Sequence, residues 1–146
     1  VAVLADMCNE CGACVTACPT AGRPYRDKPR LYVDAADFEA EDGNAFRLLG
    51  DGAIEGRFDG ATHRLAATDG ALAYEAPGLE TTLDAATFAV RTVAAPAAAA
   101  AAPVSLEPAA VLATLLAGLT AAAPHLPTGA PLAAATRVPA PELPRG

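Results

Sequence analysis

Residues 45–76 read AFRLLGDGAIEGRFDGATHRLAATDGALAYEA, a stretch in which short apolar runs alternate with Asp-Gly or Gly-Asp pairs. Such pairs supply the positive φ angles that tight hairpin turns need. Short apolar runs between turn signals are typical of strands. The stretch therefore predicts a β-meander, with Phe58 and Leu65 on the buried face. The predicted strands are Leu31–Val33, Ala45–Leu49, Ala53–Phe58, Ala61–Ala67 and Ala71–Tyr74.

The segment after the meander has an ambiguous pattern. From Thr82 to Val93, apolar residues recur at helical spacing after Asp84, which could cap a helix, although the run TFAVRTV would also suit a strand. Of these two interpretations, the helical spacing after Asp84 favours a helix. Residues 94–104 are alanine interrupted by proline, a composition typical of a linker with little to pack.

A second helix is predicted at residues 105–123. Ser105 can cap it, and Pro108 lies in the first turn, where its missing N–H does no harm. Glu107, Thr114 and the many alanines make it a poor membrane segment, so we expect no membrane span. The proline-rich residues 124–146 are predicted to be disordered. The apolar stripe of the helix consists of Val111, Leu112, Leu115, Leu116 and Leu119.

On the N-terminal side of the meander, the run CNECGACVTACP at residues 8–19 contains all four cysteines. The spacing C-x2-C-x2-C-x3-C-P is the bacterial ferredoxin pattern, in which three thiolates hold one [4Fe–4S] cluster and the fourth reaches a different cluster. The chain has no second cysteine motif. Gly12 and Ala13 are small enough to let the backbone approach a cluster. The predicted cofactor and metal ligands are Cys8, Cys11, Cys14 and Cys18.

The same cysteines allow other interpretations. Four thiolates also suit a structural Zn²⁺, although zinc sites usually separate two C-x2-C pairs by a longer loop. A redox C-x-x-C pair would need a βαβ setting that the surrounding sequence does not offer. Disulfides between such close cysteines would be strained, which favours reduced thiols and a cytoplasmic location.

Composition limits the possible functions. The 146-residue chain has a formal net charge of −7, which argues against nucleic-acid binding and suits a small electron carrier. Its 53% hydrophobic content is inflated by alanine. No basic, apolar leader is present at the start, and because Val1 is not an initiator Met we expect a processed or truncated piece.

One basic loop follows the cysteines, and it contains Arg23, Arg26, Lys28 and Arg30. These cations could dock an acidic redox partner, contact phosphates or offset the negative charge of a cluster; the alternative is a solvated connector. His63 and His125 have no obvious partner and are predicted to be surface histidines. No nucleophile–base pair, phosphate loop or dinucleotide fingerprint is recognisable, so no catalytic residue is predicted.

The run from Met7 to Pro19, with its continuation GRPYRDK at residues 22–28, resembles the C-terminal end of selenate reductase iron–sulfur flavoproteins. These proteins are similar to the glutamate synthase small subunit and to dihydropyrimidine dehydrogenase. The likeness is strongest over residues 6–33, weaker through Asn44–Gly60 and absent from the alanine- and proline-rich tail.

The resemblance implies that Cys8, Cys11 and Cys14 bind one cluster and that Cys18 serves a neighbouring cluster in a longer chain. FAD and NAD(P) would bind only to parts that are absent from this sequence. The leading hypothesis is therefore an electron-transfer module, the C-terminal fragment of a larger flavin-dependent oxidoreductase. Its partner would be a redox protein or an upstream flavin domain. The alternatives are a zinc-stabilised protein-binding module and an orphaned fragment without activity of its own.

The predicted fold class is α+β, with a small ferredoxin-type segment, a β-meander, an isolated C-terminal helix and a disordered tail. The predicted boundaries place the 4Fe-4S segment and basic loop at residues 1–30, the β-rich domain at 31–93, the linker at 94–104, the helix at 105–123 and the tail at 124–146.

Overall fold

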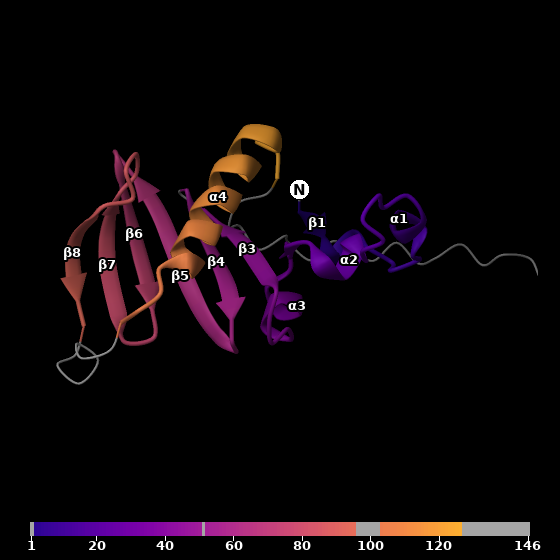
Figure 1. Ribbon diagram of the computed structural model, residues 1–146, viewed down its shortest axis with the longest axis horizontal. Helices are drawn as coiled ribbons and strands as arrows, with labels where there is room; N and C mark the ends of the chain where they lie inside the picture. Colours follow the sequence, from indigo (N-terminus) through magenta and orange to yellow (C-terminus); the bar gives the residue numbers. More distant parts are fainter. Residues whose placement is uncertain (1, 51, 96–102, 127–146) are drawn as a thin grey trace, which may run out of the picture.

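The computed structural model describes residues 2–50, 52–95 and 103–126 (Figure 1). In this part of the chain, a single sheet carries its strands in chain order from β1 to β8. The strands are β1 Val3–Leu4, β2 Arg30–Leu31, β3 Ala45–Leu49, β4 Ala53–Phe58, β5 Ala61–Thr68, β6 Ala71–Ala76, β7 Leu79–Asp84 and β8 Val90–Ala94. The helices are the 3-10 turn η1 Ala5–Met7, α1 Ala13–Thr16, α2 Pro24–Asp27, α3 Ala35–Glu39 and α4 Glu107–Ala122.

The antiparallel part of the sheet runs from β3 to β8, and tight turns connect its strands. Between β4 and β5, Asp59 has φ 51° and Gly60 has φ 76°, as a two-residue hairpin turn requires. Gly52 and Gly70 also have positive φ, and so does Gly78, which follows a proline in a turn that the sequence analysis did not single out. The predicted β-meander is confirmed.

The cysteine-bearing end of the chain is joined to this sheet through two short parallel strands. Val3 of β1 pairs with Arg30 of β2, and Arg30 pairs in turn with Ala45 of β3. The carboxylate of Asp6 adds a second connection, because it accepts hydrogen bonds from the backbone N–H groups of Val33 at 2.5 Å and Asp34 at 3.2 Å. The division of the chain after residue 30 stays a prediction, since one sheet continues across it.

Helix α4 covers one face of the sheet, where it lies across β4 and β5 (Figure 1). Close approach is possible because Gly56 of β4 has no side chain: a Cβ there would lie 2.7 Å from the ring of Phe46 and 3.0 Å from Leu112. The single C-terminal helix is confirmed, but it is packed on the sheet rather than set apart from it. The buried side chains of this core are Leu31, Phe46, Ile54, Leu65, Leu72, Tyr74, Leu79, Leu83, Ala109, Leu112 and Leu116.

A smaller core lies on the opposite face of β3, because neighbouring residues of a strand point to opposite sides. It contains Tyr32, Phe38 and Ala45, and Phe38 of α3 is completely buried. The guanidinium groups of Arg47 and Arg57 lie 5.4 and 5.3 Å from the centre of the Phe38 ring. Helix α3 thereby closes the second face near the basic loop.

The helix predicted within residues 82–93 is wrong, because β7 and β8 occupy this stretch. Asp84 does act as a cap: its Oδ1 accepts hydrogen bonds from the N–H groups of Ala86 at 3.0 Å and Thr87 at 2.9 Å. After one turn, however, Phe88 has φ 60° and the chain reverses. The β-branched residues of β8 then favour a strand.

The predicted helix at residues 105–123 is confirmed as α4. The Ser105 hydroxyl accepts a hydrogen bond from the Glu107 N–H at 3.2 Å, and Pro108 lies in the first turn as expected. Most of the predicted linker (96–102) and most of the predicted disordered tail (127–146) lie outside the described residues. None of the helices in the described ranges has the length and apolar content needed to cross a membrane.

Candidate metal centre

The four cysteines lie on a tightly turned loop around α1. Cys8 directly follows η1, and Gly12 with φ 79° immediately precedes α1, which contains Cys14. Cys11 and Cys14 are exposed, whereas Cys8 and Cys18 are half-buried, and all four are free thiols. The sequence motif therefore forms a continuous surface loop with reduced sulfur atoms.

Cys18 has a different environment from the other three. Its Sγ lies 3.3 Å from the Thr20 hydroxyl. Hydrogen bonds from the side chain and backbone of Thr20, followed by one from the backbone of Gly22, lower the pKa of the Cys18 thiol. The thiolate form that metals require is thus favoured at this position.

The structure does not bring the four cysteines together around one point. Within the described residues, no three His, Cys, Asp or Glu side chains form a group that could hold a metal ion. The donor set nevertheless suits an iron–sulfur cluster in kind, because four free thiols lie on one short loop. The space beside Gly12 is also open, since a Cβ there would have no neighbour within 4 Å. Ligand binding would require the loop to close on the cluster.

A charged network connects the cysteine loop to the sheet. Glu10, which lies between Cys8 and Cys11, is 3.6 Å from the guanidinium of Arg30 and 3.9 Å from that of Arg26. Arg30 also forms an ion pair with Glu41 at 3.2 Å. Two of the four cations of the basic loop therefore contact a residue of the cysteine motif. Sequence reasoning missed Glu10, although its place inside the motif was the available signal.

Glu41 is fixed by a second partner, because the Tyr32 hydroxyl donates a 2.8 Å hydrogen bond to its Oε1. Burial, followed by this hydrogen bond to a carboxylate, raises the pKa of Tyr32 well above its usual range. Tyr32 consequently remains a neutral hydrogen-bond donor. The guanidinium of Arg30 lies 5.5 Å from the centre of the Tyr32 ring, which adds a cation–π contact to the network.

The two histidines lie in different settings. His63 lies in β5, half-buried, with Nδ1 2.6 Å from the hydroxyl of Tyr74. The predicted surface histidine is thus only partly exposed at His63. Its partner Tyr74 lies diagonally from it on the neighbouring strand β6, a pairing that the sequence could not show. His125 follows α4 and is exposed, as predicted.

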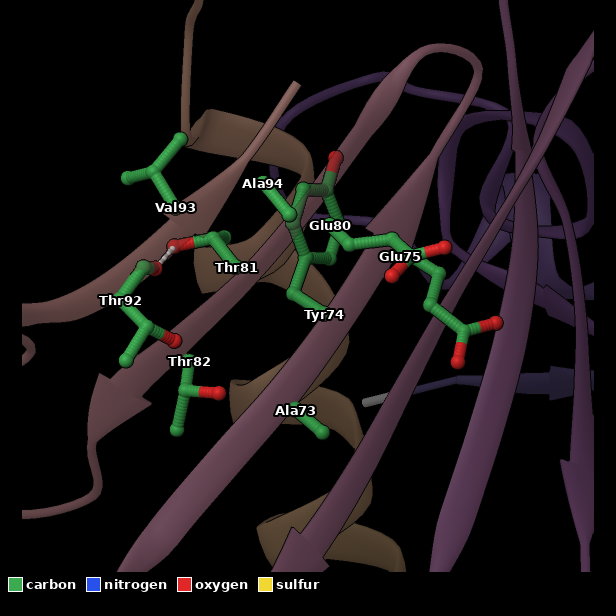
Figure 2. Close-up of a pocket in the computed structure, with 9 residues that line it drawn as sticks. All are labelled: Ala73, Tyr74, Glu75, Glu80, Thr81, Thr82, Thr92, Val93 and Ala94. Atoms are coloured by element: carbon green, nitrogen blue, oxygen red, sulfur yellow. Dashed lines mark hydrogen bonds between the residues drawn. The ribbon is translucent and has the colours of Figure 1, made fainter. Parts of the chain in front are cut away.

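One hollow lies on the sheet, away from the cysteine loop, and carries no comparable chemistry. The hollow in Figure 2 has a volume of about 230 Å³ and lies over β6, β7 and β8. At the side of this hollow, the Thr81 hydroxyl donates a 2.7 Å hydrogen bond to the Thr92 carbonyl. Its lining contains no cysteine, histidine or basic residue, so the cysteine loop remains the candidate site. The lining residues are Ala73, Tyr74, Glu75, Glu80, Thr81, Thr82, Thr92, Val93 and Ala94.

Comparison with known proteins gives the cysteine loop a chemical identity. Residues 1–21 match the sequence model of the family described as 4Fe-4S binding domain. The match implies a [4Fe–4S] cluster. It covers the four cysteines and ends before the basic loop, so it concerns the N-terminal segment and leaves the sheet unassigned.

A second comparison finds a short match to much longer proteins. The chain is 44% identical over 39 residues to "Putative oxidoreductase YgfK" of Escherichia coli strain K12 and, to the same extent, of Escherichia coli O157:H7. The matched stretch is 27% of this chain but only 4% of each relative. No solved structure matches the chain.

Proposed function

We propose that this chain is an electron-transfer module that binds a [4Fe–4S] cluster through its cysteine loop. The observation that carries the proposal is the set of four free thiols at C-x2-C-x2-C-x3-C spacing within the segment that matches 4Fe-4S binding domains. When bound, such a cluster transfers single electrons. The loop holds it, and the exposed face of the loop gives a redox partner access.

Within this proposal, Cys8, Cys11 and Cys14 hold the cluster, and Cys18 serves a neighbouring cluster in a longer chain. Cys18 follows α1 and interacts with Thr20, whereas Cys11 and Cys14 are exposed. A segment that turns away after Cys14 is the arrangement of the two-cluster ferredoxin pattern.

The larger setting is also part of the proposal. We infer a flavin-dependent oxidoreductase of which this chain is the C-terminal portion, with FAD and NAD(P) bound elsewhere in that protein. The short match to a much longer putative oxidoreductase supports one part of this inference, a place in a longer oxidoreductase. An upstream flavin domain or a separate redox protein would then be the partner, in a reducing compartment such as the cytoplasm, where thiols persist.

Anaerobic reconstitution with iron and sulfide tests the cluster. We expect broad visible absorbance and, after chemical reduction, a paramagnetic signal. Cys11→Ala should abolish both. If the wild-type chain acquires neither signal, the electron-transfer proposal is wrong. If it instead binds only zinc without sulfide, the zinc-stabilised module is favoured.

The role of Cys18 is tested by comparing Cys18→Ala with Cys14→Ala, two equal truncations on the same loop. We expect Cys18→Ala to keep the cluster and Cys14→Ala to lose it. Equal loss in both variants would show that Cys18 is instead the fourth ligand of this cluster.

A further inference from the structure

We propose that Arg30 is a positioning residue for the cluster-binding loop, acting through the carboxylate of Glu10. The inference rests on the proposed electron-transfer function, since it concerns the same loop. Arg30 would hold the segment between the first two cysteines against the sheet and place a positive charge beside Glu10, the residue before Cys11.

Arg30 is well suited to this task because both its backbone and its side chain are fixed. Its backbone lies in β2, between β1 and β3. Its side chain is only 22% exposed, compared with 60% for that of Arg26, the other cation near Glu10. Pairing with Glu10 therefore costs Arg30 little additional side-chain entropy, because the fold already restricts this side chain.

The guanidinium of Arg30 connects two carboxylates from different parts of the chain. One terminal nitrogen lies 3.2 Å from Glu41, and the other lies 3.6 Å from Glu10. The planar fork of arginine permits this double contact, which the single ammonium of lysine cannot reproduce with the same geometry. Glu41 and the Tyr32 ring hold one side of the fork and leave the other directed to Glu10.

Glu10 transmits this anchoring to the cysteines. It has φ 51°, a left-handed conformation that is unfavourable for a residue with a Cβ. The next residue, Cys11, donates its backbone N–H to Asn9 at 3.2 Å. An ion pair on the Glu10 side chain therefore stabilises the turn that sets Cys8 and Cys11 relative to each other.

The approach to β2 is fixed by a separate set of contacts. The Asn44 side-chain amide donates hydrogen bonds to the carbonyls of Arg26 at 2.7 Å and Lys28 at 3.0 Å. The basic loop thus has a defined path toward Arg30. The contact between Arg30 and Glu10 follows from the fold rather than from chance proximity of two surface side chains.

The test compares Glu10→Gln, Arg30→Gln and the double variant after reconstitution with iron and sulfide. The measured rate is the anaerobic loss of visible absorbance in excess chelator. Each single variant should lose the cluster about two- to fivefold faster, the range that a partly exposed ion pair supports. The double variant should lose the cluster more slowly than the product of the two single effects predicts, because the contact between Glu10 and Arg30 is shared by both substitutions.

The reduction potential provides a second readout. Arg30→Gln removes a cation and should lower the potential, whereas Glu10→Gln removes an anion and should raise it. A purely structural role would not give opposite signs. Arg30→Lys keeps the positive charge without the planar fork. It should restore the wild-type reduction potential, but only part of the wild-type cluster retention.

Two control variants remove one positive charge without touching Glu10. Arg23→Gln alters the same basic loop, and Arg64→Gln alters the distant strand β5; both should retain the cluster like the wild type. The inference is overturned if Arg30→Gln behaves like Arg23→Gln, or if the effects of Glu10→Gln and Arg30→Gln add in full.

Failure of the proposed function is recognised separately. If the wild-type chain takes up no cluster, hydrogen exchange of residues 8–14 in the metal-free chain still tests the anchoring. Arg30→Gln and Glu10→Gln should then each accelerate exchange, and the double variant should show less than the sum of the two effects. Unchanged exchange in both variants would refute the positioning role.

Discussion

At the scale of single residues, the Tyr74 and His63 pair shows how burial fixes a protonation state. Tyr74 is almost fully buried, at 1% exposure, and its hydroxyl lies 2.6 Å from His63 Nδ1. Burial raises the pKa of Tyr74 and lowers the pKa of His63, while the negative charge of Asp59 opposes part of the histidine shift. A neutral His63 that accepts a hydrogen bond from the tyrosine satisfies both groups.

This pair predicts a pH dependence of stability. Because the folded-state pKa of His63 lies below its unfolded value of 6.5, the unfolded chain binds the proton more readily. The free energy of unfolding should therefore fall as the pH drops below 6.5, and should be constant with respect to this group above that value. Urea titrations at several pH values measure this pH dependence of the free energy of unfolding. His63→Gln should flatten this part of the profile; an equally steep decline in that variant would exclude His63 as the cause.

Gly56 gives a second prediction at this scale. Gly56→Ala places a Cβ 2.7 Å from the Phe46 ring and 3.0 Å from Leu112, and both are buried. We expect the free energy of unfolding to fall by about 1–3 kcal/mol from overpacking. The control is Gly118→Ala in α4, where a Cβ would meet nothing within 4 Å. That change should instead stabilise the protein by about 0.5–1 kcal/mol, because alanine is the better helix former. Equal effects of the two substitutions would contradict the close packing of α4 on β4.

At the scale of secondary-structure elements, α4 is the helix that completes the main core. Ala109, Leu112 and Leu116 recur at helical spacing and are buried against the sheet. Leu112 is fully buried, whereas Leu115 is only partly so. The helix thus contributes to the stability of the sheet as well as to its own.

Truncating this contact should destabilise the whole fold. Leu112→Ala should lower the free energy of unfolding by about 2–5 kcal/mol, because it leaves a cavity between α4 and the sheet. Leu115→Ala removes the same atoms at a half-buried position and should cost less. Thermal and denaturant unfolding followed by circular dichroism measure both. If the helix had no structural role, both variants would lose the same small amount of unfolding free energy.

The elements that could be predicted from sequence are those whose signals are local. Asp59 and Gly60 encode their hairpin directly, and the leucine stripe encodes α4. Asp84 was misread because a helix cap and a tight turn use the same side-chain-to-backbone hydrogen bonds. Strands β1 and β2 have two residues each, too few for any periodic pattern, and the predicted strand Leu31–Val33 overlaps β2 only at Leu31. Their pairing depends on contacts between residues distant in sequence, which no local signal reveals.

The candidate site likewise has one part that the sequence reveals and another that only the fold reveals. The four cysteines are recognisable because their spacing is set by the chemistry of the cluster. The charged network cannot be recognised in the sequence, because it joins Glu10 in the motif to Arg30 in β2 and to Glu41 after α3. Charge alone left the basic loop open between a functional role and a solvated connector, and its partners emerge only from the fold.

At the scale of the whole molecule, the cysteine loop and the sheet are mechanically connected. Strand β1 extends the sheet, and Asp6 binds the backbone at Val33 and Asp34. Ligand binding to the loop should therefore also stabilise the sheet. A ligand that binds only the folded state stabilises every part of the protein that unfolds together with the binding site.

This coupling predicts that the cluster-loaded chain unfolds at a higher temperature than the chelator-treated chain, as measured from the β-sheet signal in circular dichroism. Asp6→Ala, which removes both backbone contacts, should reduce the difference while leaving cluster uptake intact. Identical melting of the loaded and chelated wild-type chains would show that the loop and the sheet unfold independently.

The central claim is that the cysteine loop holds a [4Fe–4S] cluster. Its most direct test is to quantify iron, acid-labile sulfide and zinc in the chain purified without oxygen. We expect about four iron atoms and about four sulfides per chain, with little zinc. One equivalent of zinc without sulfide would contradict it.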